Sequence, residues 1–169
     1  VRIFNTKMVD ELLLLDIDAT VDGRGPPFEA IGDIVEEAFL PMGYGGGIRS
    51  VEDAAALFAL GLEKVVLSSE AFANQRLVTE IADRFGAQAV AVALPHAKKL
   101  FGGQQVLTRS GKDKTGLSPV EAAQAMAAAG AGEIILTSID RDGKWSGYDL
   151  ATVDRKSTRL NSSHVSESR

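Results

Sequence analysis

Two stretches of this chain that lie far apart repeat one pattern, an apolar strand that begins at a glutamate and ends in acidic residues. Residues 11–18 read ELLLLDID and residues 133–140 read EIILTSID, so glutamate aligns with glutamate and the final aspartate with aspartate. A buried strand that delivers polar side chains to its carboxyl end is how α/β proteins place chemistry on a rigid scaffold. Two such units in one chain predict an internally duplicated α/β fold.

Around these repeats, apolar runs typical of buried strands alternate with helical patterns. Strands are predicted at residues 12–18, just before the glycine triplet at 45–47, at 64–67, at 89–94 and from 134, with helices at 27–37, after Ser50, at 76–85 and at 119–129. Ser50 and Ser118 are predicted N-caps, the second in a capping box with Glu121. Residues 97–110 interrupt the alternation and are predicted to form a β-hairpin. Buried strands that alternate with helices indicate a parallel sheet.

Length and composition limit the possible functions. The chain has 169 residues, of which 45% are hydrophobic, enough for one buried core. Its net charge is −5 and its basic residues are scattered, which argues against a nucleic-acid partner. The absence of cysteine excludes disulfides, thiolate metal sites and a cysteine nucleophile. Because no apolar run is long enough to cross a bilayer and the start does not resemble a signal peptide, we expect a cytoplasmic protein with no membrane partner.

Several motifs together resemble those of the cyclase subunit of imidazole glycerol phosphate synthase, over about residues 1–153. They are residues 1–5 (VRIFN), 10–16 (DELLLLD), 45–49 (GGGIR), 136–143 (LTSIDRDG) and 146–149 (SGYD). The resemblance implies a (βα)8 barrel built from two half-barrels, which would explain the repeat. Such barrels typically need ~250 residues. We therefore expect residues 1–156 to form an incomplete (βα)8 barrel domain with strands two to six of eight and a β-hairpin after the fourth strand present.

The end of the chain breaks this pattern. Residues 157–169 include five serines and keep neither helical nor strand periodicity. We interpret them as a non-native segment, such as a translated cloning adaptor, or as a disordered polar tail, and leave them out of the fold prediction.

Glycines and serines at two neighbouring strand ends are candidates for phosphate binding. Gly46 and Gly47 follow a predicted strand, where bare backbone lets amide groups approach phosphate oxygens closely, although the same glycines could serve only a tight turn. Ser68 and Ser69, at the next strand end, supply hydroxyl and amide donors. The resemblance implies that these four residues form one phosphate site.

Other polar residues at strand ends match the catalytic side of the family's barrel. The resemblance implies supporting catalytic roles for Asp16 and Thr137, which could instead only order their loops. Asp142 and Gly143 match part of a second phosphate site, so a bis-phosphorylated small-molecule substrate is implied. Pro95 stands where the family has one of two general acid–base aspartates, and proline cannot exchange a proton. The other aspartate belongs to the first strand, which this chain lacks.

Three charged residues lie at the opposite, amino-terminal strand ends. Glu11, Lys64 and Glu133 match members of a charged ring that, in the family, gates ammonia entering the barrel. An ordinary surface ion-pair cluster is the alternative interpretation. The gate would imply a glutaminase subunit as partner at the amino-terminal face of the barrel. The resemblance implies no cofactor and no metal.

The resemblance thus implies a fragment of a cyclase, a carbon–nitrogen lyase of histidine biosynthesis. The family uses ammonia to convert a ribulosyl aminoimidazole nucleotide to imidazole glycerol phosphate and aminoimidazole carboxamide ribotide. Because of Pro95 and the missing first strand, we expect the fragment itself to be inactive. Residues 39–44 and 98–102 look closer to a paralogous branch that forms amidines on bacterial surface sugars. A non-catalytic ammonia-conducting scaffold is a third possibility, favoured by Pro95.

Overall fold

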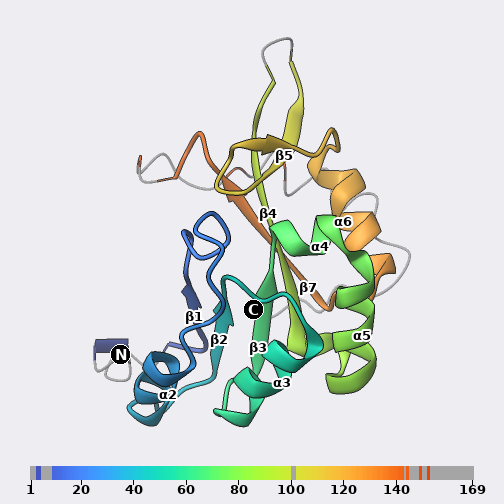
Figure 1. The fold of residues 1–169 in the computed structure, drawn as a ribbon. Coiled ribbons are helices and arrows are strands. Elements are labelled where there is room, and N and C mark those ends of the chain that lie inside the picture. The colour runs from blue at the N-terminus through green and yellow to red at the C-terminus, as the bar shows by residue number, and fades with distance from the viewer. Residues whose placement is uncertain are drawn as a thin grey trace.

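Strands and helices alternate along the chain and build a curled sheet in the computed structural model (Figure 1). The structure describes residues 3–4, 9–99, 102–142, 144, 149 and 152. Across the sheet the parallel strands are β1 (Leu12–Leu15), β2 (Met42–Gly45), β3 (Lys64–Leu67), β4 (Val90–Lys98) and β7 (Glu133–Ser138). Each strand pairs in parallel with its neighbour, which confirms the predicted α/β fold and partial (βα)8 barrel.

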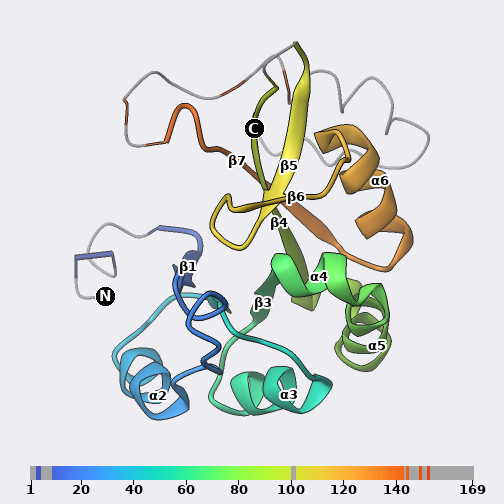
Figure 2. The same ribbon diagram turned by 45° about the horizontal axis from the view of Figure 1, so that its top comes forward.

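The helices lie in an arc around the outside of the curled sheet (Figure 2). They are α2 (Phe28–Glu36), α3 (Val51–Ala59), α4 (Ser69–Ala73), α5 (Gln75–Phe85) and α6 (Pro119–Ala128), with a 3₁₀ turn η1 (Ala87–Ala89) before β4. The sequence did not predict α4, a five-residue helix directly after β3. Within the described part of the chain, no helix is both long and apolar enough to span a membrane.

Both predicted N-caps begin helices. The Ser50 hydroxyl oxygen accepts a hydrogen bond from the Asp53 amide at 3.0 Å, and the Asp53 carboxylate accepts from the Ser50 amide at 3.1 Å. Ser118 and Glu121 form the same reciprocal pair, with proline at the first helical position. The backbone and side-chain hydrogen bonds from Ser118 lower the pKa of Glu121 below its usual value. These local contacts fix where α3 and α6 begin.

The sheet has one face toward the helices and one inner face. Side chains of alternate strand residues pack with the helices into a buried core, which includes Met42, Tyr44, Val65, Leu67, Val92 and Leu94 from the strands and Ile31, Leu57, Leu77, Ile81 and Met126 from the helices. Because successive strand residues point to opposite faces, Lys64, Pro95 and Thr137 belong to the inner face. The inner face is where the predicted barrel places its chemistry.

Strand β2 shows why glycine is needed on that inner face. A Cβ atom on Gly43 would lie 2.6 Å from Cδ2 of Leu13, and one on Gly45 would lie 2.8 Å from Cβ of Val66. Both distances are too short for real contacts. The two glycines therefore leave room for larger side chains of the neighbouring strands.

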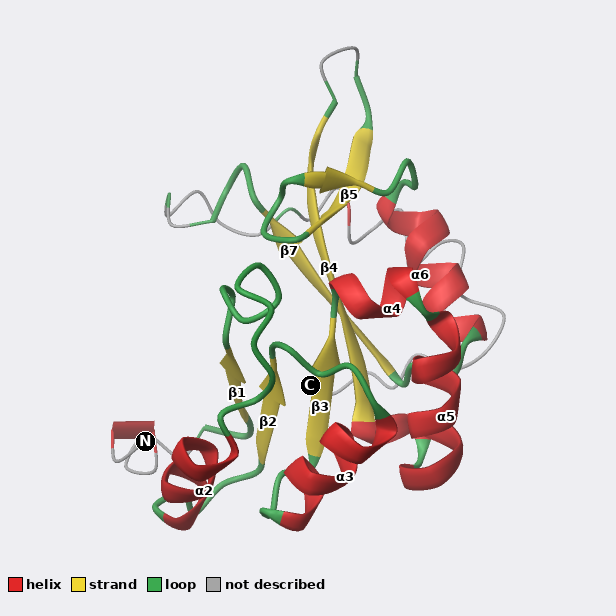
Figure 3. Cartoon of the chain, in the orientation of Figure 1, coloured by secondary structure: helices red, strands yellow, loops and turns green. Residues whose placement is uncertain are grey.

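The predicted hairpin is present, and its first strand is a direct continuation of β4. Strand β4 does not end at residue 94. It continues to Lys98 because β7 pairs with it as far as His96 and β5 (Gln104–Thr108) pairs antiparallel from His96 onward. Strand β6 (Asp113–Lys114) then pairs antiparallel with β5. The hairpin formed by the end of β4 and by β5 extends beyond the rest of the sheet in Figure 3. Residues 157–169, expected to be a non-native or disordered tail, and Gly143 lie outside the described residues.

Candidate functional site at the carboxyl edge of the sheet

Most of the predicted site residues lie along one edge of the sheet. Asp16 follows β1, the glycine pair Gly46 and Gly47 follows β2, and Ser68 and Ser69 follow β3. Thr137 is near the end of β7, and Asp142 lies in the turn after it. Because the strands are parallel, their carboxyl ends meet at this edge. The structure thus brings the residues together on one side, while their roles stay predictions.

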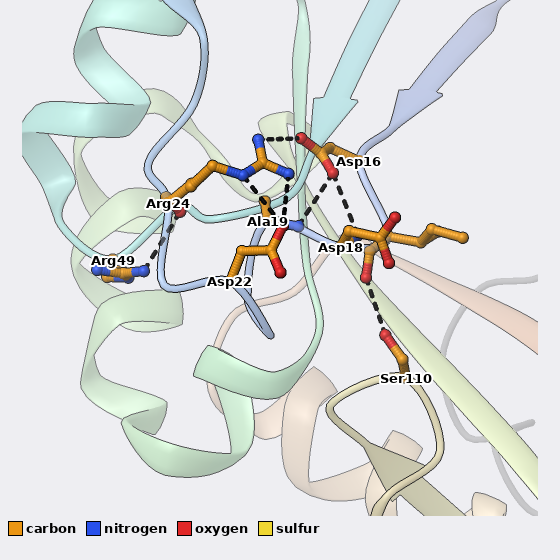
Figure 4. A network of polar contacts seen from close by, with 8 residues as sticks. Asp16, Asp18, Ala19, Asp22, Arg24, Arg49 and Ser110 are labelled. Atoms are coloured by element: carbon orange, nitrogen blue, oxygen red, sulfur yellow. Dashed lines mark hydrogen bonds and ion pairs between the residues drawn. The ribbon is translucent and has the colours of Figure 1, made fainter.

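Asp16 holds its own loop in place (Figure 4). Its Oδ1 atom accepts hydrogen bonds from the amides of Asp18 and Ala19 at 3.1 and 3.0 Å, and its Oδ2 atom accepts from Arg24 at 3.3 Å. Arg24 also binds the Asp22 carboxylate at 3.1 Å. Both oxygens of Asp16 therefore have loop partners in this structure, which matches the alternative reading that Asp16 orders the loop. Arg24 was not predicted from the sequence.

The glycine pair supports the same loop. Gly46 and Gly47 have φ values of +137° and +67°, a region that favours glycine. A Cβ atom on Gly46 would lie 2.6 Å from the Asp16 carbonyl oxygen, and one on Gly47 would lie 2.3 Å from the Arg24 carbonyl oxygen. The Arg49 guanidinium donates to that same Arg24 oxygen at 3.2 Å. Close packing of the loop is sufficient to explain both glycines, so phosphate binding by them remains a prediction.

A second loop reaches this edge from the hairpin. The Arg109 amide donates to the Ser69 hydroxyl oxygen at 2.8 Å. The Ser110 hydroxyl donates to the Ile17 carbonyl oxygen, also at 2.8 Å (Figure 4). Sequence reasoning missed both contacts because each joins residues far apart in the chain. The only local signal was an Arg-Ser-Gly turn between two short strands.

Pro95 occupies the inner face as a regular strand residue. β4 and β7 pair here without a bulge, with Pro95 opposite Thr137 and His96 opposite Ser138. Burial alternates along β4, so Leu94 and His96 are buried together while Pro95 is more open. The His96 side chain is 1% exposed and points away from the inner face. His96 therefore does not stand in for the expected acid–base aspartate.

Tyr44 is a buried polar residue that the sequence did not single out. Its side chain is 1% exposed, and its hydroxyl has no hydrogen-bond partner among the residues that the structure describes. Burial raises the pKa of Tyr44 to about 12, and the negative charge of Asp16 adds to the rise, which Arg24 opposes. The phenol is therefore neutral at physiological pH and lies close to the Asp16–Arg24 pair.

The turn after β7 is tied to the hairpin. The Asp140 carboxylate accepts a hydrogen bond from the Lys98 amide at 2.8 Å. Further along, Gln104 donates to the Asp149 carboxylate at 2.8 Å and accepts from the Thr152 hydroxyl at 2.6 Å. Burial alone would raise the pKa of Asp149, but the neighbouring Thr152 and Gln104 side chains and the positive charge of Arg141 outweigh it and lower the pKa. Asp142 itself is exposed, and its amide donates to the Ser138 carbonyl.

The charged residues predicted at the opposite edge do gather. The Lys64 ammonium lies 2.8 Å from the Glu11 carboxylate and 2.5 Å from the Glu133 carboxylate. The Lys64 side chain is only 15% exposed. Burial alone would lower the pKa of Lys64, but the hydrogen bonds that its ammonium donates to the two carboxylates outweigh it and raise the pKa. Lys64 is thus a protonated bridge between β1, β3 and β7 on the inner face.

None of the described residues form a group of three or more histidine, aspartate and glutamate side chains placed to hold a metal ion.

A curled parallel sheet, wrapped by helices and carrying polar residues at its carboxyl edge, defines an α/β-barrel protein. The chain belongs to the histidine biosynthesis protein family, whose sequence model matches residues 1–166.

The relatives carry related names. The chain is 46% identical over 154 residues to a putative imidazole glycerol phosphate synthase subunit hisF2 of Pseudomonas aeruginosa, an alignment that covers 91% of this chain and 61% of the relative. It is 43% identical to a putative subunit hisF3 of Vibrio vulnificus (92% and 60% covered). It is 41% identical to the imidazole glycerol phosphate synthase subunit HisF of Alkaliphilus metalliredigens (95% and 64% covered). The chain therefore spans about three-fifths of the length of these relatives.

Proposed function

We propose that this chain is part of the cyclase subunit of an imidazole glycerol phosphate synthase, holding strands two to six of its barrel. The complete subunit would act as a carbon–nitrogen lyase. It would use ammonia from a glutaminase subunit to convert a ribulosyl aminoimidazole nucleotide to imidazole glycerol phosphate and aminoimidazole carboxamide ribotide. Membership of the family and the names of three relatives support this proposal. The cytoplasmic location expected from the sequence remains a prediction.

The observation that carries the proposal is the placement of different chemistry at the two edges of one sheet. At the amino edge, Lys64 bridges Glu11 and Glu133 on the inner face. At the carboxyl edge, hydroxyl groups, glycine amides and carboxylates follow the strands. A barrel that receives ammonia at one end and a phosphorylated substrate at the other requires this division.

In this proposal each edge has its own task. The glutaminase subunit would dock at the amino edge, and Lys64 would release one carboxylate to let neutral ammonia pass. At the other edge, the substrate's two phosphates would be bound by the ends of β2 and β3 and by the turn after β7. Asp16 and Thr137 would support the reacting groups between them. Pro95 offers no proton to exchange, so we propose that this chain alone does not turn over the substrate.

Partner binding tests the amino edge. The chain is mixed with the glutaminase subunit from the same source, and complex formation is measured by sedimentation. We expect a complex that Glu133→Ala weakens several-fold and that Lys112→Ala, at the opposite edge, leaves unchanged. A glutaminase subunit that fails to bind the unaltered chain, or that binds the Glu133 variant equally well, would contradict the proposed docking face.

One titration experiment distinguishes the proposed function from its two alternatives. Residues 39–44 and 98–102 favour the surface-sugar branch, which would use ammonia on a different acceptor. Pro95 on the inner face favours an ammonia-conducting scaffold that binds no substrate. Calorimetric titration with the ribulosyl nucleotide and with a surface-sugar acceptor distinguishes the three. We expect the nucleotide to bind without turnover in ammonium salts. Binding of the sugar alone would support the surface-sugar branch, and binding of neither would support the scaffold.

A further inference from the structure

The β5–β6 turn, residues 109–112, lies across the carboxyl edge of the sheet. Its Arg109 amide donates to the Ser69 hydroxyl oxygen after β3. Its Ser110 hydroxyl donates to the Ile17 carbonyl oxygen after β1 (Figure 4). A Cβ atom on Gly111 would lie 3.5 Å from Cδ1 of Ile139, which follows β7. The turn therefore contacts the chain just beyond the ends of three barrel strands.

The backbone of this turn is strained for the residues that form it. Arg109 and Ser110 have φ values of +50° and +56°, and Gly111 follows at +83°. Residues with a side chain adopt this left-handed region at a cost that glycine avoids. Glycine would be less strained than arginine at position 109. Strain that is kept in this way suggests a binding function for the arginine side chain.

Among the residues that the structure describes, the Arg109 guanidinium has only a loose partner. It lies 3.7 Å from the Asp113 carboxylate, and the two side chains are 56% and 55% exposed. Charge-assisted hydrogen bonds are typically much shorter, and exposed pairs of this kind contribute little. In contrast, Arg24 at the same edge is held by Asp16 and Asp22. Arg109 can therefore exchange its partner for an anion at low cost.

We propose that Arg109 binds the substrate phosphate that Ser68 and Ser69 would hold, and so selects for a phosphorylated end of the substrate. The Arg109 side chain is longer than the distance between the Arg109 amide and the Ser69 hydroxyl, so its guanidinium can reach a phosphate held at Ser69. The Ser69 hydroxyl oxygen accepts from that amide, which leaves its proton to donate to a phosphate oxygen. The guanidinium fork matches two phosphate oxygens. This inference rests on the proposed function, because it requires a phosphate at this edge.

The test is titration of the 169-residue chain with inorganic phosphate at constant ionic strength, followed by calorimetry and by amide shifts of Ser69 and Arg109. Arg109→Gly is the informative variant, because glycine relieves the strain at φ +50° while removing the guanidinium. We expect it to keep or raise stability and to weaken phosphate binding about tenfold. Arg109→Lys should keep part of the affinity, because it retains the charge and loses the fork.

Two further variants complete the design. Lys112→Ala removes the same charge from the same turn and is expected to change phosphate affinity less than about twofold. Asp113→Asn removes the competing carboxylate and should tighten phosphate binding. Equal affinities for the unaltered chain and Arg109→Gly, or equal losses in the Arg109 and Lys112 variants, would overturn the role of Arg109 alone. An unaltered chain that binds no phosphate would overturn the phosphate site of the proposed function as well.

Discussion

At the amino edge of the sheet, strands position the charged groups, whereas at the carboxyl edge loops position them. Lys64 begins β3 and Glu133 begins β7, and the register of both strands with β4, which lies between them, brings their side chains together. Asp16 instead acquires its partners from its own loop, and Ser69 acquires one from the distant β5–β6 turn. The first kind of site follows from sheet register, and the second depends on contacts between loops. Substitutions can test how far this difference extends.

The largest effect is expected from Gly47→Ala at the carboxyl edge. The new Cβ atom would meet the Arg24 carbonyl oxygen at 2.3 Å in a left-handed conformation. We expect the free energy of unfolding to fall by about 3 kcal/mol, measured by urea denaturation. Gly102→Ala is the control, because Gly102 has φ +91° but open space around it. It should cost only about 1–2 kcal/mol. Equal losses would mean that the loop at residues 16–25 moves aside easily.

At the amino edge, Lys64→Met should cost about 2 kcal/mol, between the values for exposed and buried ion pairs. The variant leaves the carboxylates of Glu11 and Glu133 close together without a cation. Arg76→Met is the matched control, since Arg76 is 87% exposed and paired with Glu80 on one helix. It should cost less than about 0.5 kcal/mol. If both variants behave alike in urea titrations, the Lys64 cluster is an ordinary surface feature.

Tyr44→Phe tests the buried hydroxyl beneath the Asp16 loop. Because this hydroxyl has no partner in the described structure, its removal should raise the free energy of unfolding by about 1 kcal/mol. Thermal and urea denaturation measure the change. A loss of stability would contradict this prediction, because it would show that the Tyr44 hydroxyl donates a hydrogen bond to a group at the carboxyl edge.

The smallest effect is expected from alkaline pH. The folded state raises the pKa of Tyr44 from 10.0 to about 12, so the unfolded chain loses this proton first, and stability begins to fall as pH approaches 10 and falls further above it. The pKa of Lys64 is also raised, so its contribution is complete below its ordinary value of 10.5 and is lost above it. Between pH 9 and 10, stability should fall by about 0.5 kcal/mol. Tyr44→Phe should remove most of this fall, and an unchanged slope would rule out Tyr44 as its source.

Much of the fold could be predicted because its signals are local. The strand runs, the caps at Ser50 and Ser118, and the hairpin each depend on residues close together in the sequence. The cluster of Glu11, Lys64 and Glu133 also followed, since all three lie at strand starts in a parallel sheet.

The sequence could predict which residues lie at the carboxyl edge, but not which of them contact one another. The bond from Arg24 to Asp16 and the bond from Arg109 to Ser69 depend on loop paths that no periodicity encodes. The direction of His96 depended on whether β4 contained a bulge, and only the register with β7 settles it. Tyr44 resembled any core aromatic residue until its hydroxyl was found without a partner among the described residues.

The glycines of β2 also determine how this sheet can change its sequence. An alanine at Gly43 would meet the tip of the Leu13 side chain at 2.6 Å, which a shorter residue at position 13 would relieve, and would then keep only the milder contacts with the Lys64 backbone oxygen and Cβ at 3.2 and 3.3 Å. An alanine at Gly45 would meet the Val66 backbone oxygen at 2.8 Å, which no change of side chain at 66 can remove. Positions 13 and 43 should therefore vary as a linked pair, whereas position 45 should stay fixed. A library that randomises 13 and 43 together should yield folded combinations that substitutions made one at a time would miss.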